Sequence, residues 1–146
     1  SGATIYTLSE TASDIASEKL AERHDRADLL AGVDLTEQDD VIAGVLMDLA
    51  RTETAPRSDR LAEALVAGLS NSIGKLHKRP RLEASFSVLK AADIPAVLLE
   101  LGFMSSERDL ENLLDLDWRA KAATGIRDAL RVWAAADAAE AALLRQ

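Results

Sequence analysis

Residues Ile94–Ser106 read IPAVLLELGFMSS, and this stretch decides the fold class because it contains the most apolar strand in the sequence. Five apolar residues run from Pro95 to Leu99, and a carboxylate, Glu100, follows them. Apolar side chains on both faces are typical of a strand that helices cover on each side, as in a parallel sheet. A charged side chain at the end of such a strand needs a chemical reason.

The sequence predicts few strands. β-branched and aromatic residues predict one at Ala3–Leu8, and two more are expected at Ser85–Lys90 (SFSVLK) and Pro95–Phe103 (PAVLLELGF). Helix-forming segments separate them, so the predicted fold class is α/β, with a mixed or parallel sheet flanked by helices. Three strands are few for such a sheet, which indicates an incomplete domain.

Three helices are predicted between the first two strands. The first, within residues 11–32, should be only partly buried because its apolar face is thin: Ile15, Leu20, Leu29 and Leu30, with Gly32 as a stop. The second starts at Thr36 and carries one apolar stripe: Val41, Ile42, Val45, Leu46 and Leu49. Pro56 and Ser58 predict a break before the third, which ends near Gly74 and repeats an apolar residue every four positions: Leu61, Leu65, Leu69 and Ile73.

Two more helices follow the apolar strand. Ser105 or Ser106 is expected to cap a helix through ERDLENLL, residues 107–114. Trp118 opens a last long helix, and its predicted inner face consists of Ile126, Leu130 and Trp133.

Composition excludes several functional classes. The 146 residues suit about one domain, 48% of them are hydrophobic, and only 3% are aromatic. A net charge of -8 argues against nucleic acid as a partner. No apolar run has the length of a membrane span, and the absence of cysteine excludes disulfides and thiolate metal sites.

Glu100 is the candidate catalytic residue. Ligands of open parallel sheets collect beyond the carboxyl ends of strands, and Gly102 allows a close turn there. A carboxylate walled by Leu and Phe loses solvation, which raises its pKa toward the range useful to a general base. The alternative is a solvated acid at a strand end, or an acid paired with Arg or Lys.

The residue types for a metal site are scarce. A catalytic zinc typically needs three protein ligands, and the two histidines, His24 and His77, are far apart with no HExxH motif. His77 is expected in a surface connector and His24 on a solvated helix. No phosphate loop or nucleophile motif occurs, so Ser105 and Ser106 are interpreted as caps.

Several stretches together resemble the zinc-dependent N-acetylmuramoyl-L-alanine amidases of the periplasmic cell-separation type. In order they are GATIYTLSE, RADLLAGVDLTEQDDVIAGVLMDLARTET and GKLHKRPRLEASFSVLKAADIPAVLLELGFMSSERD. The resemblance runs from Gly2 to about Trp133, and its most specific block is Lys75–Ser106. Glu100 matches the family's catalytic glutamate, although Leu101 and Gly102 replace the usual Thr or Ser and small residue after it.

The resemblance implies an enzyme of peptidoglycan in the periplasm. Such enzymes hydrolyse the amide between N-acetylmuramic acid and the first L-alanine of the stem peptide, with Glu100 as general base. Their zinc is held by two histidines and a glutamate upstream of the segment that matches GATIYTLS. The resemblance therefore leads us to expect that residues 1–146 are the C-terminal portion of one catalytic domain, with the N-terminal strands of its sheet absent. This portion is expected to be inactive alone and without bound Zn²⁺.

Residues 10–73 are expected to contain a helical regulatory insertion, because Glu18–Ala50 resembles the family's autoinhibitory segment. In such relatives an acid blocks the zinc until a LytM-domain activator displaces it. His24 stands near that position and is a possible regulatory ligand, with Glu22 or Asp28 as alternatives, although all three also suit a solvated charged face.

Two further expectations concern partners. The apolar stripe that ends at Leu49 is either core or the docking face of a regulatory helix, so the alternative function is a non-catalytic module that binds a LytM-domain activator. An incomplete sheet also exposes an edge, so self-association is expected.

Overall fold

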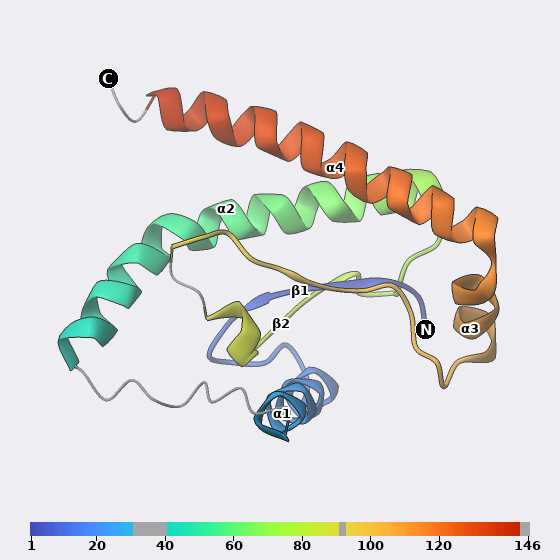
Figure 1. Cartoon of the computed structure of the whole chain (residues 1–146), viewed down its shortest axis with the longest axis horizontal. Coiled ribbons are helices and arrows are strands. Elements are labelled where there is room, and N and C mark those ends of the chain that lie inside the picture. Colours follow the sequence, from blue (N-terminus) through green and yellow to red (C-terminus); the bar gives the residue numbers. More distant parts are fainter. Residues whose placement is uncertain (31–40, 91–92, 144–146) are drawn as a thin grey trace. The chain divides into compact units, whose positions relative to one another are not determined.

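The computed structural model describes residues 1–30, 41–90 and 93–143; for residues 27–30 and 41–48 it describes the backbone only. Figure 1 shows the elements along the chain. They are β1 (Thr4–Leu8), α1 (Ile15–Leu30), α2 (Val41–Ile73), β2 (Arg81–Ala84), the short 3-10 helix η1 (Ser87–Leu89), β3 (Leu98–Glu100), α3 (Glu107–Leu114) and α4 (Leu116–Leu143).

The described strands form a mixed three-stranded sheet in the order β2-β1-β3. β1 and β2 are parallel, because Ile5 N donates to Pro80 O (2.8 Å) and Ser9 N donates to Ala84 O (3.1 Å). In a mixed sheet of this order β3 must run antiparallel to β1, as its course in Figure 1 shows. The predicted α/β class with a small mixed sheet is confirmed.

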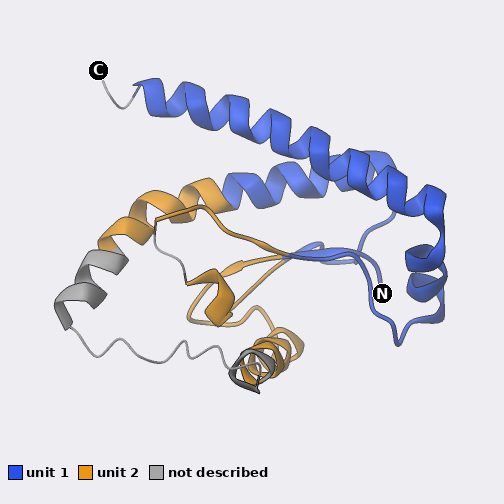
Figure 2. Cartoon of the chain, viewed as in Figure 1, with its two compact units in different colours: residues 1–5, 59–81, 99–146 blue, residues 6–58, 82–98 orange. Residues whose placement is uncertain are grey.

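The chain divides into two compact units (Figure 2). Unit 1 comprises residues 1–5, 59–81 and 99–146, and unit 2 comprises residues 6–58 and 82–98. The expected regulatory insertion, residues 10–73, does not coincide with either unit, since the boundary divides α2.

Unit 2 has a core of large side chains. Tyr6 and Phe86 meet edge to face with ring centroids 5.2 Å apart, and the remaining buried members are Leu20, Ala21, Leu82, Ala84 and Leu89. α1 is only partly buried, as predicted: Leu20 is in the core, whereas Ile15 is exposed. The side chains of Leu29 and Leu30, and the predicted stop at Gly32, lie outside the described residues.

The second predicted strand is wrong in its position. β2 lies just before SFSVLK, and that stretch instead forms η1. Phe86 and Leu89, three positions apart, are both buried, whereas Val88 is exposed. A strand would place Phe86 and Val88 on one face, so the burial of positions three apart favours the tight helical turn.

The predicted helix break at Pro56 is also wrong, because α2 continues through this proline (Figure 1). Proline cannot donate the helix hydrogen bond that would reach Thr52 O. The neighbouring hydroxyls do not replace this bond, because Thr54 Oγ1 donates to Ala50 O (3.3 Å) and Ser58 Oγ donates to Thr54 O (3.2 Å). Burial of the following turns stabilises the helix more than propensity does. The start predicted at Thr36 lies outside the described residues.

Unit 1 packs the second half of α2 against α4. Leu61, Leu65 and Leu69 are buried as predicted, and α2 ends at Ile73, where Gly74 adopts φ +79°. The predicted inner face of α4 is wrong: Ile126 and Trp133 are half-buried and Leu130 is exposed. The buried positions of α4 are Ala122, Gly125 and Ala129.

The backbones of α2 and α4 approach each other closely, which explains why the buried residues of α4 are small. A Cβ built on Gly68 would lie 2.5 Å from Gly125 O, and one on Gly125 would lie 2.1 Å from Ser72 Oγ. Larger side chains are therefore directed away from this crossing. No helix among the described residues combines the length and apolar character needed to cross a membrane.

Candidate active site

Glu100 is the last residue of β3, and it is half-buried with its Oε2 atom buried. We expected Glu100 to lie at the end of the sheet where parallel strands have their carboxyl ends, and this is wrong. β3 runs antiparallel to β1, so the carboxyl end of β3 lies beside the amino end of β1. Because the Oε2 atom of Glu100 is buried, this residue is not a fully solvated acid at a strand end. The general-base role of Glu100 stays a prediction.

The turn after Glu100 is fixed by a buried acid on α3. Asp109 Oδ2 accepts hydrogen bonds from Phe103 N (3.1 Å) and Gly2 N (2.9 Å). Gly102 is needed for close approach, since an added Cβ would lie 3.0 Å from Asp109 Cβ. Ser106, rather than Ser105, caps α3 and accepts from Asp109 N (3.4 Å).

The backbone at the start of β1 packs closely against the connector that follows α2. Gly2 adopts φ +95°, and a Cβ there would lie 2.7 Å from His77 N and 2.8 Å from the carbonyl carbon of Leu76. His77 N donates to Ala3 O (3.1 Å), so the connector after α2 lies directly against β1. Only glycine fits at position 2 without displacing this backbone.

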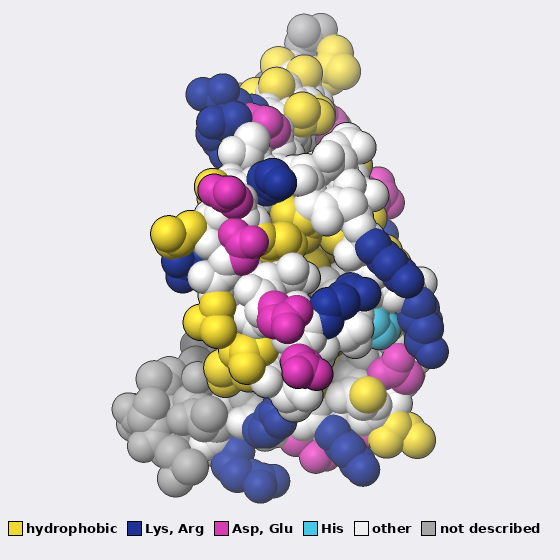
Figure 3. Space-filling model, turned by 90° about the vertical axis from the view of Figure 1, so that its right-hand side faces the viewer, with side chains coloured by type: hydrophobic (Ala, Val, Ile, Leu, Met, Phe, Trp, Pro, Cys, Tyr) yellow, Lys and Arg dark blue, Asp and Glu magenta, His cyan; other side chains and the backbone are white. Residues whose placement is uncertain are grey.

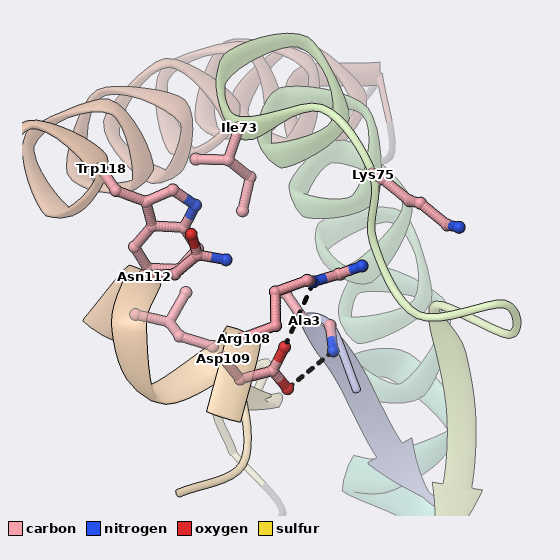
Figure 4. A pocket seen from close by; sticks show the side chains of 9 residues that line it. Ala3, Ile73, Lys75, Arg108, Asp109, Asn112 and Trp118 are labelled. Carbon is pink, nitrogen blue, oxygen red and sulfur yellow. Dashed lines mark hydrogen bonds and ion pairs between the residues drawn. The ribbon is translucent and has the colours of Figure 1, made fainter. Parts of the chain in front are cut away.

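A cavity of about 190 Å³ lies beside this region in unit 1 (Figure 4). The residues that line it include Leu101, Asp109, Lys75, Arg108 and Trp118. Glu100 does not line it. The cavity and the candidate base are therefore separate features.

Exposed hydrophobic side chains lie around α3: Met104, Leu110, Leu114 and Leu116. On the face drawn in Figure 3, hydrophobic side chains are scattered among acidic and basic ones. The charge on this face is mixed rather than of one sign, so it offers no strong field to steer a charged ligand.

The two histidines lie in different units. His24 is half-buried in unit 2, where its ring meets that of Phe86 with centroids 5.9 Å apart, so the expected full solvation is wrong. His77 lies in the connector of unit 1, where it is half-buried and its Nδ1 atom lies 2.9 Å from Arg79 O. Glu22 is exposed, and the side chain of Asp28 lies outside the described residues.

The described residues do not fit a zinc site by themselves. Within residues 1–30, 41–90 and 93–143, His, Asp and Glu side chains form no group of three or more that could hold a metal ion. A catalytic zinc needs about three protein ligands.

Sequence reasoning missed Asp109. The signal was present, because Ser106 and Asp109 stand three residues apart at a helix start, similar to the capping box. In a capping box the acid bonds to the cap residue, whereas here the carboxylate bonds to Phe103 and Gly2. Only the fold brings Gly2 to this position.

Comparisons with known proteins agree on one family. Residues 1–132 match the model of Amidase_3, described as N-acetylmuramoyl-L-alanine amidase. The chain is 35% identical over 130 residues to N-acetylmuramoyl-L-alanine amidase AmiA of Salmonella typhimurium (88% of this chain, 45% of the relative). It is 34% identical over 128 residues to AmiA of Escherichia coli (87% and 44%), and 30% identical over 134 residues to AmiC of Escherichia coli (91% and 32%). The chain thus spans less than half the length of these curated relatives.

Proposed function

The chain belongs to the N-acetylmuramoyl-L-alanine amidase family Amidase_3, and from this premise we propose that it supplies the general base of a peptidoglycan hydrolase. The reaction is hydrolysis of the amide between N-acetylmuramic acid and the L-alanine of the stem peptide, in the periplasm and during cell separation. The observation that carries the proposal is Glu100, a half-buried carboxylate on the last residue of a strand.

In this mechanism Glu100 accepts a proton from water as the water oxygen attacks the amide carbonyl. The same carboxyl group then donates the proton to the leaving nitrogen, so the amide bond breaks with protons balanced. General-base catalysis needs the acceptor within hydrogen-bond reach of the water. Glu100 is the last residue of β3 and directly precedes a turn whose amide at Phe103 donates to Asp109. This placement supports the role, because it restricts the carboxylate of Glu100.

The family resemblance implies zinc, but the described residues offer no set of ligands for it. The reaction steps above therefore involve only Glu100 and water. We propose that other residues of the full-length protein supply those ligands. Residues 1–146 then act as the C-terminal portion of the catalytic domain and are inactive alone.

The test is Glu100→Gln in the full-length protein, measured as muropeptide release from purified peptidoglycan. Loss of a general base typically costs about 10²- to 10⁴-fold in rate. Glu111→Gln, an exposed acid of α3, is the matched control and should keep the wild-type rate. Full activity in the Glu100→Gln protein would contradict the base assignment.

A second proposed role concerns regulation by the helices within residues 10–73. Ile15 on α1 and Leu49 on α2 are 69% and 66% exposed, which supports a docking face for a LytM-domain activator. Leu49 is the only member of its predicted stripe with a described side chain, so a core role for the stripe is wrong at that position. His24, with Glu22 and Asp28 as alternatives, remains the proposed regulatory ligand.

Binding of a LytM-domain protein tests this second role. Leu49→Glu and Ile15→Glu should each weaken capture of the activator, because a charge replaces an apolar contact. Val132→Glu, at an exposed apolar position of α4, is the control and should bind as the wild type does. Unchanged binding by both variants would exclude these helices as the docking face.

Self-association through the sheet is the remaining proposal. β2 and β3 are the outer strands of the described sheet, and outer strands offer unpaired backbone groups to another chain. A concentration-dependent elution volume in size-exclusion chromatography is expected, and a monomer at all concentrations would contradict it.

A further inference from the structure

Asp109 is a buried acid that the proposed reaction does not use. Its side chain is 2% exposed, and its Oδ2 atom accepts both the Phe103 N–H (3.1 Å) and the Gly2 N–H (2.9 Å). The two donors are main-chain groups from opposite parts of the sequence. Because a single oxygen accepts both N–H groups, it fixes two backbone segments at once.

The same residue closes a small network within the turn. Ser106 N donates to Phe103 O (2.9 Å), and Asp109 N donates to Ser106 Oγ (3.4 Å). Gly102 packs directly against Asp109, since an added Cβ would lie only 3.0 Å from Asp109 Cβ. The backbone from Gly102 to Asp109 is therefore tied to itself as well as to the start of β1.

This hydrogen-bond network lies close in sequence to Glu100, the candidate base. Only Leu101 and Gly102 separate Glu100 from the amide that Asp109 holds. A strand of three residues makes few ladder hydrogen bonds of its own, so the turn that follows it strongly affects where its last side chain lies.

We propose that Asp109 is a positioning residue, which fixes the carboxylate of Glu100 by holding Phe103 and Gly2 on one oxygen. The inference rests on the proposed role of Glu100. A simple helix cap does not account for Asp109, because the cap uses its backbone N–H, whereas the carboxylate binds two amides outside α3. The Arg108 guanidinium, 3.9 Å away and 51% exposed, adds little.

Two substitutions in the full-length protein separate hydrogen bonding from charge. Asp109→Ala removes the acceptor, whereas Asp109→Asn keeps an oxygen that can occupy the Oδ2 position and accept both amides. We expect Asp109→Ala to lower kcat about 10- to 100-fold with KM within about twofold, because a misplacement near 1 Å can cost about 10²-fold. Asp109→Asn should restore most of kcat, and Arg108→Ala should match the wild type.

The structural readout is hydrogen exchange at the amides of Phe103 and Gly2. Both should lose protection in Asp109→Ala and keep it in Asp109→Asn. Each kcat is divided by the folded fraction, so that simple loss of stability does not imitate the effect.

Glu100→Gln measured in parallel keeps the two proposals distinguishable. If Glu100→Gln is fully active, the proposed function fails whatever Asp109 does. If Glu100→Gln is inactive but folded Asp109→Ala has wild-type kcat, the base assignment stands and the positioning role is wrong. Asp109→Asn as slow as Asp109→Ala would also overturn it, because charge rather than hydrogen bonding would then be the cause.

Discussion

Unit 2 and unit 1 differ in what fills their interiors. Unit 2 buries large side chains, with Phe86 fully buried against Tyr6. Unit 1 brings two helix backbones together at Gly68 and Gly125. Unit 1 also buries aliphatic side chains, such as Leu65 and Leu69, but its helices α2 and α4 meet through glycine backbone. We expect the aromatic core of unit 2 to be sensitive to deletion of atoms, and the helix crossing in unit 1 to be sensitive to addition of atoms.

The largest expected effect is Phe86→Ala in unit 2. Removing a fully buried aromatic ring leaves a cavity, and such changes cost about 3–5 kcal/mol of unfolding free energy. Urea denaturation followed by circular dichroism measures it. Val88→Ala is the neighbouring control, because this exposed side chain should change stability by less than about 0.5 kcal/mol. Equal effects of the two would contradict the burial of Phe86.

Gly125→Ala tests the opposite sensitivity in unit 1. The added methyl group would meet Ser72 Oγ at 2.1 Å and Gly68 O at 2.8 Å. Overpacking of this kind costs about 1–3 kcal/mol, although alanine is the better helix former. In the double variant with Ser72→Ala the loss should be smaller than the sum of the single losses, because Ser72 Oγ, the nearest of the three obstructing atoms, is gone. Strict additivity would show that the helices are not in contact there.

Gly74→Ala separates backbone strain from crowding. Gly74 has φ +79°, but no atom lies within 4 Å of the place that an added methyl group would take. Adopting the left-handed conformation costs about 1–2 kcal/mol for a residue with a Cβ. We expect a loss in that range in thermal unfolding, unaffected by Ser72→Ala. Coupling between positions 72 and 74 would indicate that the end of α2 had shifted.

The smallest effect is expected for Arg60→Ala, on the surface of unit 1. Arg60 pairs with Glu140 (2.5 Å) and more distantly with Asp137 (3.9 Å) across α2 and α4. Exposed ion pairs contribute about 0–1 kcal/mol, and salt screens them. The difference from wild type should therefore shrink between low and high salt. A large, salt-independent loss would point to packing of the arginine stem instead.

Helix positions were predicted better than strand positions. The periodic leucines of α2 and the caps of α3 depend on neighbours a few residues away, so local rules identify them. SFSVLK failed because both a strand and a tight turn suit its composition, and only burial of Phe86 and Leu89 together distinguishes them. The inner face of α4 failed for a similar reason, since a preference for large apolar residues cannot anticipate a crossing that admits only small ones.

The sequence alone determined the family resemblance, the α/β class and the identity of the candidate base, because these depend on residue types and their order. The tertiary structure decided that β3 runs against β1, which of two serines caps α3, and that Asp109 holds Gly2 and Phe103. The physical reason is distance along the chain. Periodicity and capping act over a few residues, whereas strand direction and a hydrogen bond between residues 2 and 109 exist only after the chain has folded.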